Sequence, residues 1–574
     1  MKHLKLKPTL LSVLIAGVVL TACNSGQESV VENAGAIPTQ LPLIDSEPSG
    51  RVNENQQRVI QEAAISESRE AEMDLEIAVM SPPVMMPGTR IGISQDLMYL
   101  PEAGTENYAE FDDSGIQIVI ENAVSTFSID VDTGAYSNVR RMLNQGYLPP
   151  ADAVRAEELI NYFSYNYPIT DSNVPFSVMT EVSTSPWNTG KHLLHIGIKA
   201  NEPTSTDELH TNLVFLVDVS GSMASPDKLD LLKNSLKMLS RQLSAQDSVS
   251  LVVYAGASGV VLEPTAGNET REISAALDRL QAGGSTNGAA GIQLAYAMAE
   301  QAFIEDGINR VILATDGDFN VGMSSVDALK DLIEEKRESG ISLTTLGFGT
   351  GNYNDHMMEQ LADAGNGNYA YIDNINEARK VLVDEMSSTL QTVAKDVKIQ
   401  IEFNPSVVAE YRLVGYENRE LAREDFNNDQ VDAGEIGAGH TVTAIYEIAL
   451  LGSESLSMDS LRYNQESAVG SGNVDELGFL KLRYKEPDSD ESILLERALL
   501  ASDISEDFTN TSDNYRFSAA VAGLAQLLRG SDQAGTLDYD TVINLAQSAK
   551  GEDEFGYRSE FIQLVRSAQA LSLN

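Results

Sequence analysis

The sequence predicts an α/β domain with a doubly wound, mostly parallel sheet, inserted in a β-sandwich and accompanied by flanking helical segments. Three observations predict this fold class. Short apolar runs alternate with amphipathic helical patterns between residues 212 and 390, as in βαβ units. Runs that alternate apolar and polar residues lie on both sides of this region, as in antiparallel strands with one wet face. Helical patterns occupy the first module and the tail.

A secretory signal is predicted at the start of the chain. A lysine-rich beginning precedes an apolar run over Leu10–Leu20, which is too short to be a convincing membrane span. The following Leu20-Thr21-Ala22-Cys23 resembles the lipobox of bacterial lipoproteins. This resemblance implies cleavage before Cys23 and attachment of lipid, palmitate included, to its sulfur and new amino group. Asn24 replaces the Asp of inner-membrane retention, which favours the outer membrane over the inner membrane of the cell envelope.

The next segment, residues 24–115, predicts a disordered tether because it is rich in Gln, Glu, Ser and Pro and poor in aromatic residues. Folding is expected to begin near Ile116, with helical patterns over Ala135–Gln145 and Ala153–Phe163. Asp130 and Asp132 have the spacing of metal ligands. Because no further carboxylate lies close by in sequence, we interpret them as loop or capping residues.

The central region alternates predicted strands and helices. A leucine stripe with a spacing of three and four residues marks the first helix as facing the core. The predicted strands are Leu213–Val217, Ser248–Ala255, Arg310–Thr315, Ser342–Phe348 and Tyr369–Ile372, with Val260–Leu262 in an edge hairpin. The predicted helices are Lys228–Leu243, Thr270–Gln281, Gly288–Ile304, Val326–Glu338, Asp355–Ala364 and Asn376–Leu390.

The flanking regions supply the predicted sandwich and a helical tail. The sandwich strands are Phe176–Thr184, His192–Lys199, Val397–Phe403, Val407–Val414, Thr441–Ala449 and Phe479–Tyr484. The tail helices are Leu494–Ser502, Tyr515–Leu528, Tyr539–Ala549 and Tyr557–Ala570. The resulting domain assignment is 1–22 signal peptide, 23–115 tether, 116–170 N-terminal helical module, 171–205 first part of the sandwich, 206–392 α/β domain, 393–490 second part of the sandwich and 491–574 C-terminal helical region.

Polar residues follow two apolar strands of the central region. Asp218, Ser220 and Ser222 come directly after Leu213–Val217, and Asp316 comes directly after Arg310–Thr315. Open α/β sheets bind ligands beyond the carboxyl ends of their strands. The side chains of these residues offer only oxygen, which Mg²⁺ prefers. The same residue types also cap helices and form turns, which is the simpler interpretation.

With Thr286 in a turn-rich loop, these residues resemble the von Willebrand factor type A domain and its metal-ion-dependent adhesion site, Asp-x-Ser-x-Ser, Thr, Asp. The resemblance implies that Asp218, Ser220, Ser222, Thr286 and Asp316 hold Mg²⁺, with Mn²⁺ or Ca²⁺ as alternatives. One open coordination position would accept an Asp or Glu of a protein partner. The segments 125–163 and 394–446 resemble the modules that flank the type A domain in a family of bacterial lipoproteins.

Charge and cysteine usage limit the possible partners. The 574 residues carry a formal net charge of -46, from 85 acidic and 39 basic residues. Binding to nucleic acid, or to a membrane other than through the lipid anchor, is therefore not expected. Cys23 is the single cysteine, so an intramolecular disulfide is impossible. We expect a monomer.

Other functions remain open from the sequence. A metal-dependent hydrolase would need a base beside Ser220, and neither a His-Glu-x-x-His nor a Gly-x-Ser-x-Gly motif is present. We therefore expect a protein without enzymatic activity, and a purely structural envelope protein is a third possibility. Residues 425–432 mimic the start of an EF-hand loop but have Gln430 and Ile436 where Gly and Glu belong, so a polar hairpin loop is the alternative to a calcium site.

Overall fold

The computed structural model describes residues 106–169, 174–201, 210–286, 288–317, 326–351, 353–458, 474–487 and 489–573. The predicted signal peptide, Cys23 and nearly all of the predicted tether lie outside the described residues. Among the helices in these ranges, none is long and apolar enough to cross a membrane.

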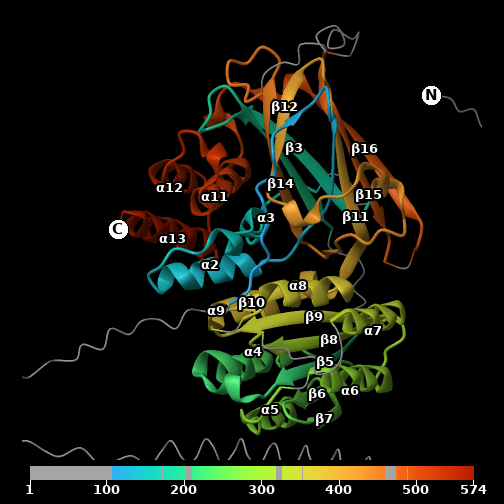
Figure 1. Cartoon of the computed structure of the whole chain (residues 1–574). Coiled ribbons are helices and arrows are strands. Elements are labelled where there is room, and N and C mark those ends of the chain that lie inside the picture. Colours follow the sequence, from blue (N-terminus) through green and yellow to red (C-terminus); the bar gives the residue numbers. More distant parts are fainter. Residues whose placement is uncertain are drawn as a thin grey trace, which may run out of the picture. The chain divides into compact units, whose positions relative to one another are not determined.

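The central α/β domain is built on a six-stranded sheet with the order β10-β9-β8-β5-β6-β7 (Figure 1). Its strands are β5 (Thr211–Asp218), β6 (Ser248–Tyr254), β7 (Ser258–Ala266), β8 (Ile308–Thr315), β9 (Ile341–Phe348) and β10 (Tyr369–Ile372). All neighbouring pairs are parallel except β6 and β7, which are antiparallel. The predicted fold class and the edge hairpin are therefore confirmed.

Helices cover both faces of this sheet, because successive side chains of a strand point to opposite sides. Along β5, Leu213, Phe215 and Val217 share a buried cluster with α4 and α5, whereas Val214 and Leu216 share one with α6, α7 and α8. The helices are α4 (Leu231–Ser240), α5 (Thr270–Asp278), α6 (Gly288–Gln301), α7 (Val326–Glu338) and α8 (Asp355–Ala364), followed by α9 (Ile375–Arg379), η5 (Lys380–Asp384) and α10 (Met386–Leu390).

A β-sandwich surrounds this insertion. One sheet has the strand order β1-β12-β14-β4-β3-β17. The other sheet has the order β13-β11-β15-β16, and its strand β11 also pairs with β2. Their apolar faces share one buried cluster, to which Ile196 on β4 and Ile399 on β11 both belong. The bounds are β1 (Gln117–Ile118), β2 (Val124–Ser128), β3 (Phe176–Thr184), β4 (His192–Ala200), β11 (Thr392–Phe403), β12 (Val408–Val414), β13 (Ile436–Gly437), β14 (Thr441–Leu450), β15 (Glu476–Lys485), β16 (Ser492–Leu500) and β17 (Ile504–Ser505).

One predicted helix is wrong. Leu494–Ser502 reads as an Ala/Leu helix, but Ser492–Leu500 is strand β16 and pairs with β15 along its whole length. Helix propensity is a weak preference, and the unpaired edge of β15 supplies backbone partners that override it. The sandwich therefore extends past the predicted limit at residue 490. It also takes in β1 and β2 from the segment predicted to be an N-terminal helical module.

Helices from both ends of the described chain share a second core. The N-terminal pair is α2 (Gly134–Asn144) and α3 (Ala156–Asn161), and the C-terminal group is α11 (Asp513–Arg529), α12 (Tyr539–Ser548) and α13 (Tyr557–Ser572). Their buried residues form one cluster that includes Trp187, the single tryptophan. The ring of Phe163, just after α3, lies 4.9 Å from that of Phe517 on α11. Segments that are about 350 residues apart in sequence therefore stabilise each other.

Buried ion pairs join these helices to the α/β domain. Arg140 on α2 is only 2% exposed and contacts Asp373 and Glu377, which flank the start of α9. Arg155, directly before α3, contacts Asp355 at the start of α8 at 2.5 Å. Because separating such buried pairs leaves uncompensated charge, these contacts fix the α/β domain against the neighbouring helices.

Candidate metal site at the edge of the α/β sheet

The parallel register of the sheet brings the predicted site residues to one edge. β5 pairs with β8 so that Val217 lies opposite Ala314. Asp218 ends β5 and Asp316 comes directly after β8, so both carboxylates project from the carboxyl ends of neighbouring strands. This is the edge where open α/β sheets bind ligands.

Asp218 organises the first loop from a fully buried position. One of its carboxylate oxygens, Oδ1, accepts a hydrogen bond from the backbone N–H of Ser220 at 2.8 Å. The other, Oδ2, accepts the hydroxyl of Thr315 at 3.0 Å and that of Tyr254 at 3.3 Å. Burial raises the pKa of Asp218 above its ordinary value, and the nearby charge of Asp316 raises it further. A cation at this edge would favour the charged form.

The two serine hydroxyls have the spacing of neighbouring metal ligands. The hydroxyls of Ser220 and Ser222 are hydrogen-bonded to each other, with their Oγ atoms 2.9 Å apart. In an octahedral Mg²⁺ site with ligands at about 2.0–2.1 Å, adjacent oxygens are separated by about 2.9 Å. Ser220 is buried and Ser222 is exposed, so this pair of hydroxyls connects the interior of the loop with its outer surface. The donor set therefore fits a small, hard cation.

Backbone hydrogen bonds hold the Thr286 loop against the first loop. The N–H of Gly283 donates to the carbonyl of Val219 at 2.8 Å, and the N–H of Gly221 donates to the carbonyl of Gly284 at 3.0 Å. Thr286 follows in this loop, half-buried and two residues before α6 begins. Asp218, the last residue of β5, and the loops that carry the other four predicted residues thus lie at the same edge of the sheet.

A basic residue that the sequence reasoning assigned only to a helix also reaches this edge. Lys228 Nζ donates to Asp316 Oδ2 at 2.8 Å, and the side chains are 8% and 0% exposed. Lys228 is the first basic residue after Ser222, and this closeness in sequence is the signal that could have linked it to the site. Hydrophobic periodicity places it in a helix without showing where the ammonium group lies.

A second acidic cluster forms where α3 meets the α/β domain. Carboxylate oxygens of Asp130, Glu158 and Glu359 lie within 4.8 Å of one another, and all three residues are buried. Two guanidinium groups already occupy this cluster. Arg155 contacts Glu158, and Arg419 contacts Asp130 and Glu359, both at 3.2 Å.

Protons contribute to the neutrality of this cluster as well. Burial raises the pKa of Glu359 to about 7, and it raises the pKa of Glu158 well above its usual range. Asp130 also accepts the N–H of Asp132 at 2.9 Å, as expected for a loop-capping residue. We therefore interpret these carboxylates as structural residues that join the helices to the α/β domain.

The EF-hand-like loop is bound by basic side chains. Lys398 donates to the carbonyl of Asn428 at 2.7 Å, and Arg483 contacts Asp429 at 3.2 Å. Asp432 pairs with Arg337 at 2.6 Å. These contacts give the loop carboxylates the role of ion-pair partners, in keeping with the alternative of a polar hairpin loop.

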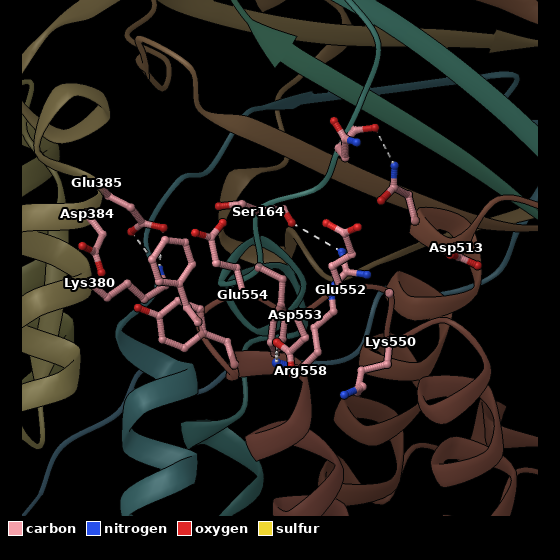
Figure 2. A pocket seen from close by; sticks show the side chains of 16 residues that line it. Ser164, Lys380, Asp384, Glu385, Asp513, Lys550, Glu552, Asp553, Glu554 and Arg558 are labelled. Atoms are coloured by element: carbon pink, nitrogen blue, oxygen red, sulfur yellow. Dashed lines mark hydrogen bonds and ion pairs between the residues drawn. The ribbon is translucent and has the colours of Figure 1, made fainter.

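A cleft of about 610 Å³ lies between the end of α3, η5 and the loop from α12 to α13 (Figure 2). Several of its charged groups are engaged in local contacts within a single segment of the chain. Lys380 donates to both carboxylate oxygens of Glu385 at 2.7 and 2.8 Å. Asp553 accepts the backbone N–H groups of Arg558 and Ser559 at the start of α13. The loop edge of the α/β sheet is therefore the stronger candidate for the functional site.

Comparison with known proteins identifies the modules. The von Willebrand factor type A domain model matches residues 212–384. A model described as von Willebrand factor matches residues 102–195, and the model of the C-terminal region of uncharacterized protein YfbK matches residues 388–571. YfbK of Escherichia coli is 47% identical over 482 residues, which cover 83% of each chain. The chain belongs to the YfbK family.

More distant similarities cover smaller parts of the chain or are lower in identity. An uncharacterized protein of Synechocystis is 26% identical over 314 residues, which cover 54% of this chain and 69% of that protein. Among solved structures, the von Willebrand factor type A protein from Catenulispora acidiphila is 17% identical, covers 68% of this chain and 91% of its own, and has a TM-score of 0.38. The predicted type A domain and C-terminal family module are confirmed by the family matches, whereas the lipid anchor stays a prediction.

Proposed function

We propose that this protein binds an acidic protein partner through a divalent cation, with Mg²⁺ as the favoured ion. The hydroxyls of Ser220, Ser222 and Thr286 would coordinate the ion directly. The carboxylates of Asp218 and Asp316 would coordinate it directly or bind its water molecules. The observation that carries this proposal is the 2.9 Å separation of the two serine hydroxyls beside a buried carboxylate. Type A domains often bind protein ligands through a metal, which supports the same assignment.

The chemistry of the ion explains the preference for an acidic partner. Hydroxyl ligands are neutral, so a cation with few charged ligands stays electrophilic and accepts an additional carboxylate from outside. Ser222 is exposed, which places the outer side of the site within reach of a partner. The partner is therefore expected to present an Asp or Glu side chain, and the protein itself is expected to act as a monomer.

We further propose that the protein is not an enzyme. A serine nucleophile needs an adjacent base. Within the described part of the chain, no hydrogen bond joins Ser220 to any histidine. The histidines there are His192 and His195 on β4, His210 before β5, His356 on α8 and His440 before β14.

Anchoring to the cell envelope through Cys23, with the outer membrane favoured, is part of the proposal and rests on the sequence alone. Metabolic labelling of cells with a palmitate analogue tests this part. Incorporation into the wild-type protein and its loss in Cys23→Ser would support the anchor. Equal labelling of both proteins would contradict it.

The metal site is tested by calorimetric titration of Mg²⁺ and Mn²⁺ into the full chain. Ser220→Ala removes one proposed ligand and should weaken binding by at least tenfold. Ser235→Ala is the matched control, because the Ser235 hydroxyl is buried in α4 and donates to the carbonyl of Leu231 at 2.8 Å. Equal affinity of wild type and Ser220→Ala would refute the assignment. If Ser220→Ala instead binds the ion more weakly, capture of an acidic peptide that is lost in EDTA would extend the assignment to the partner.

A further inference from the structure

Lys228 gives the metal site a cation of its own. Its ammonium nitrogen lies 2.8 Å from Asp316 Oδ2, and both side chains are buried. Two opposite charges this close in a site shielded from water attract each other strongly. We infer that Lys228 is a resident counter-ion of the site, with which a divalent cation competes for Asp316. This inference rests on the proposed metal site.

The position of Lys228 is built into the fold. Its side chain lies along Gly349, which has a φ of +75° in the loop after β9. A Cβ at this glycine would lie 2.2 Å from Cε and 2.3 Å from Cγ of Lys228. The hydroxyl of Tyr371 donates to the Gly349 carbonyl and holds the loop in place. The lysine stem therefore occupies a trough that a residue with a side chain would fill.

The charge balance determines the direction of the effect. Asp218 and Asp316 provide two negative charges when ionised, and Lys228 cancels one of them. A divalent cation then meets a site with less negative charge and a neighbouring positive charge, which weakens its binding. In the metal-free protein, the same ammonium group balances the charge of the buried Asp316.

These two roles predict opposite effects of removing the ammonium group. Lys228→Met should destabilise the protein in EDTA, because the buried Asp316 loses its ion pair with the ammonium group. The same variant should bind Mn²⁺ at least tenfold more tightly than wild type, because the competing charge is gone. Saturating Mn²⁺ should consequently raise the melting temperature of the variant more than that of wild type.

The experiment compares Mn²⁺ affinity by calorimetry and melting temperature in EDTA and in saturating Mn²⁺, with the full chain. Lys380→Met is the matched control, because Lys380 is also 2% exposed and ion-paired, with Glu385 at 2.7 Å, but lies on η5 (Figure 2). This control should lose stability in both conditions and keep the wild-type affinity. Lys228→Gln, which is neutral but still donates a hydrogen bond, serves if the methionine variant does not fold.

The outcomes separate the two proposals. Tighter Mn²⁺ binding by Lys228→Met or Lys228→Gln, with unchanged affinity in Lys380→Met, supports the counter-ion. Equal or weaker binding by the Lys228 variants, with measurable binding by wild type, overturns the counter-ion and leaves the metal site standing. Absence of Mn²⁺ binding by every form overturns both.

Discussion

Removal of the buried guanidinium of Arg155 should destabilise the junction between the α/β domain and the neighbouring helices. Arg155 is 2% exposed, contacts Glu158, lies 2.5 Å from Asp355 and 3.7 Å from Glu359. Arg155→Met keeps much of the apolar volume but leaves these buried carboxylates without that partner. Removing one member of a buried ion pair costs about 3–5 kcal/mol of unfolding free energy. We expect a loss of that size at pH 8.

The pH dependence of this loss is part of the prediction. Burial raises the pKa of Glu359 to about 7, so at pH 5.5 its carboxyl is largely protonated in the folded protein. A protonated carboxyl does not need a cationic partner, and the effect of Arg155→Met should therefore be smaller at pH 5.5 than at pH 8.

Urea denaturation followed by circular dichroism measures the effect. Arg337→Met is the control, because Arg337 pairs with Asp432 across side chains that are 23% and 53% exposed. Exposed pairs contribute under about 1 kcal/mol. A loss in Arg155→Met no larger than that of the control at pH 8 would refute the reasoning about the buried junction.

Three further predictions concern backbone, pH and site geometry. Gly317→Ala should lower the free energy of unfolding in urea by about 3 kcal/mol, because φ is +88° and a Cβ would lie 2.5 Å from the backbone N of Asn354. The control Gly146→Ala, where φ is +87° and the surrounding space is open, should lower it by only about 1 kcal/mol. Burial raises the pKa of the Glu157 carboxyl to about 8, so the free energy of unfolding should fall as the pH rises from about 4.5 to 8. Glu157→Gln should therefore flatten the dependence of melting temperature on pH, and an unchanged slope would contradict this. Thr315→Val removes the 3.0 Å hydrogen bond to Asp218 and should weaken Mn²⁺ binding several-fold by calorimetry, whereas wild-type affinity would show that this bond does not position the carboxylate.

The sequence by itself determined the α/β domain and the location of its candidate site. Buried parallel strands are short apolar runs, and the polar residues that follow them must reach the same edge, because parallel strands share their direction. Asp218 and Asp316 could therefore be placed together without knowledge of the tertiary structure. The helices of this domain were predicted for a similar reason, since their apolar stripes follow the helical period.

Only the tertiary structure decided which charges meet and which edges pair. Lys228 and Arg155 read as ordinary helical or pre-helical residues, because periodicity describes the apolar face of a helix and not the reach of a long polar side chain. Asp130 gained Glu158 and Glu359 as neighbours from segments far apart in sequence. Ser492–Leu500 became a strand because β15 offered an unpaired edge, and local propensity contains no information about such a partner.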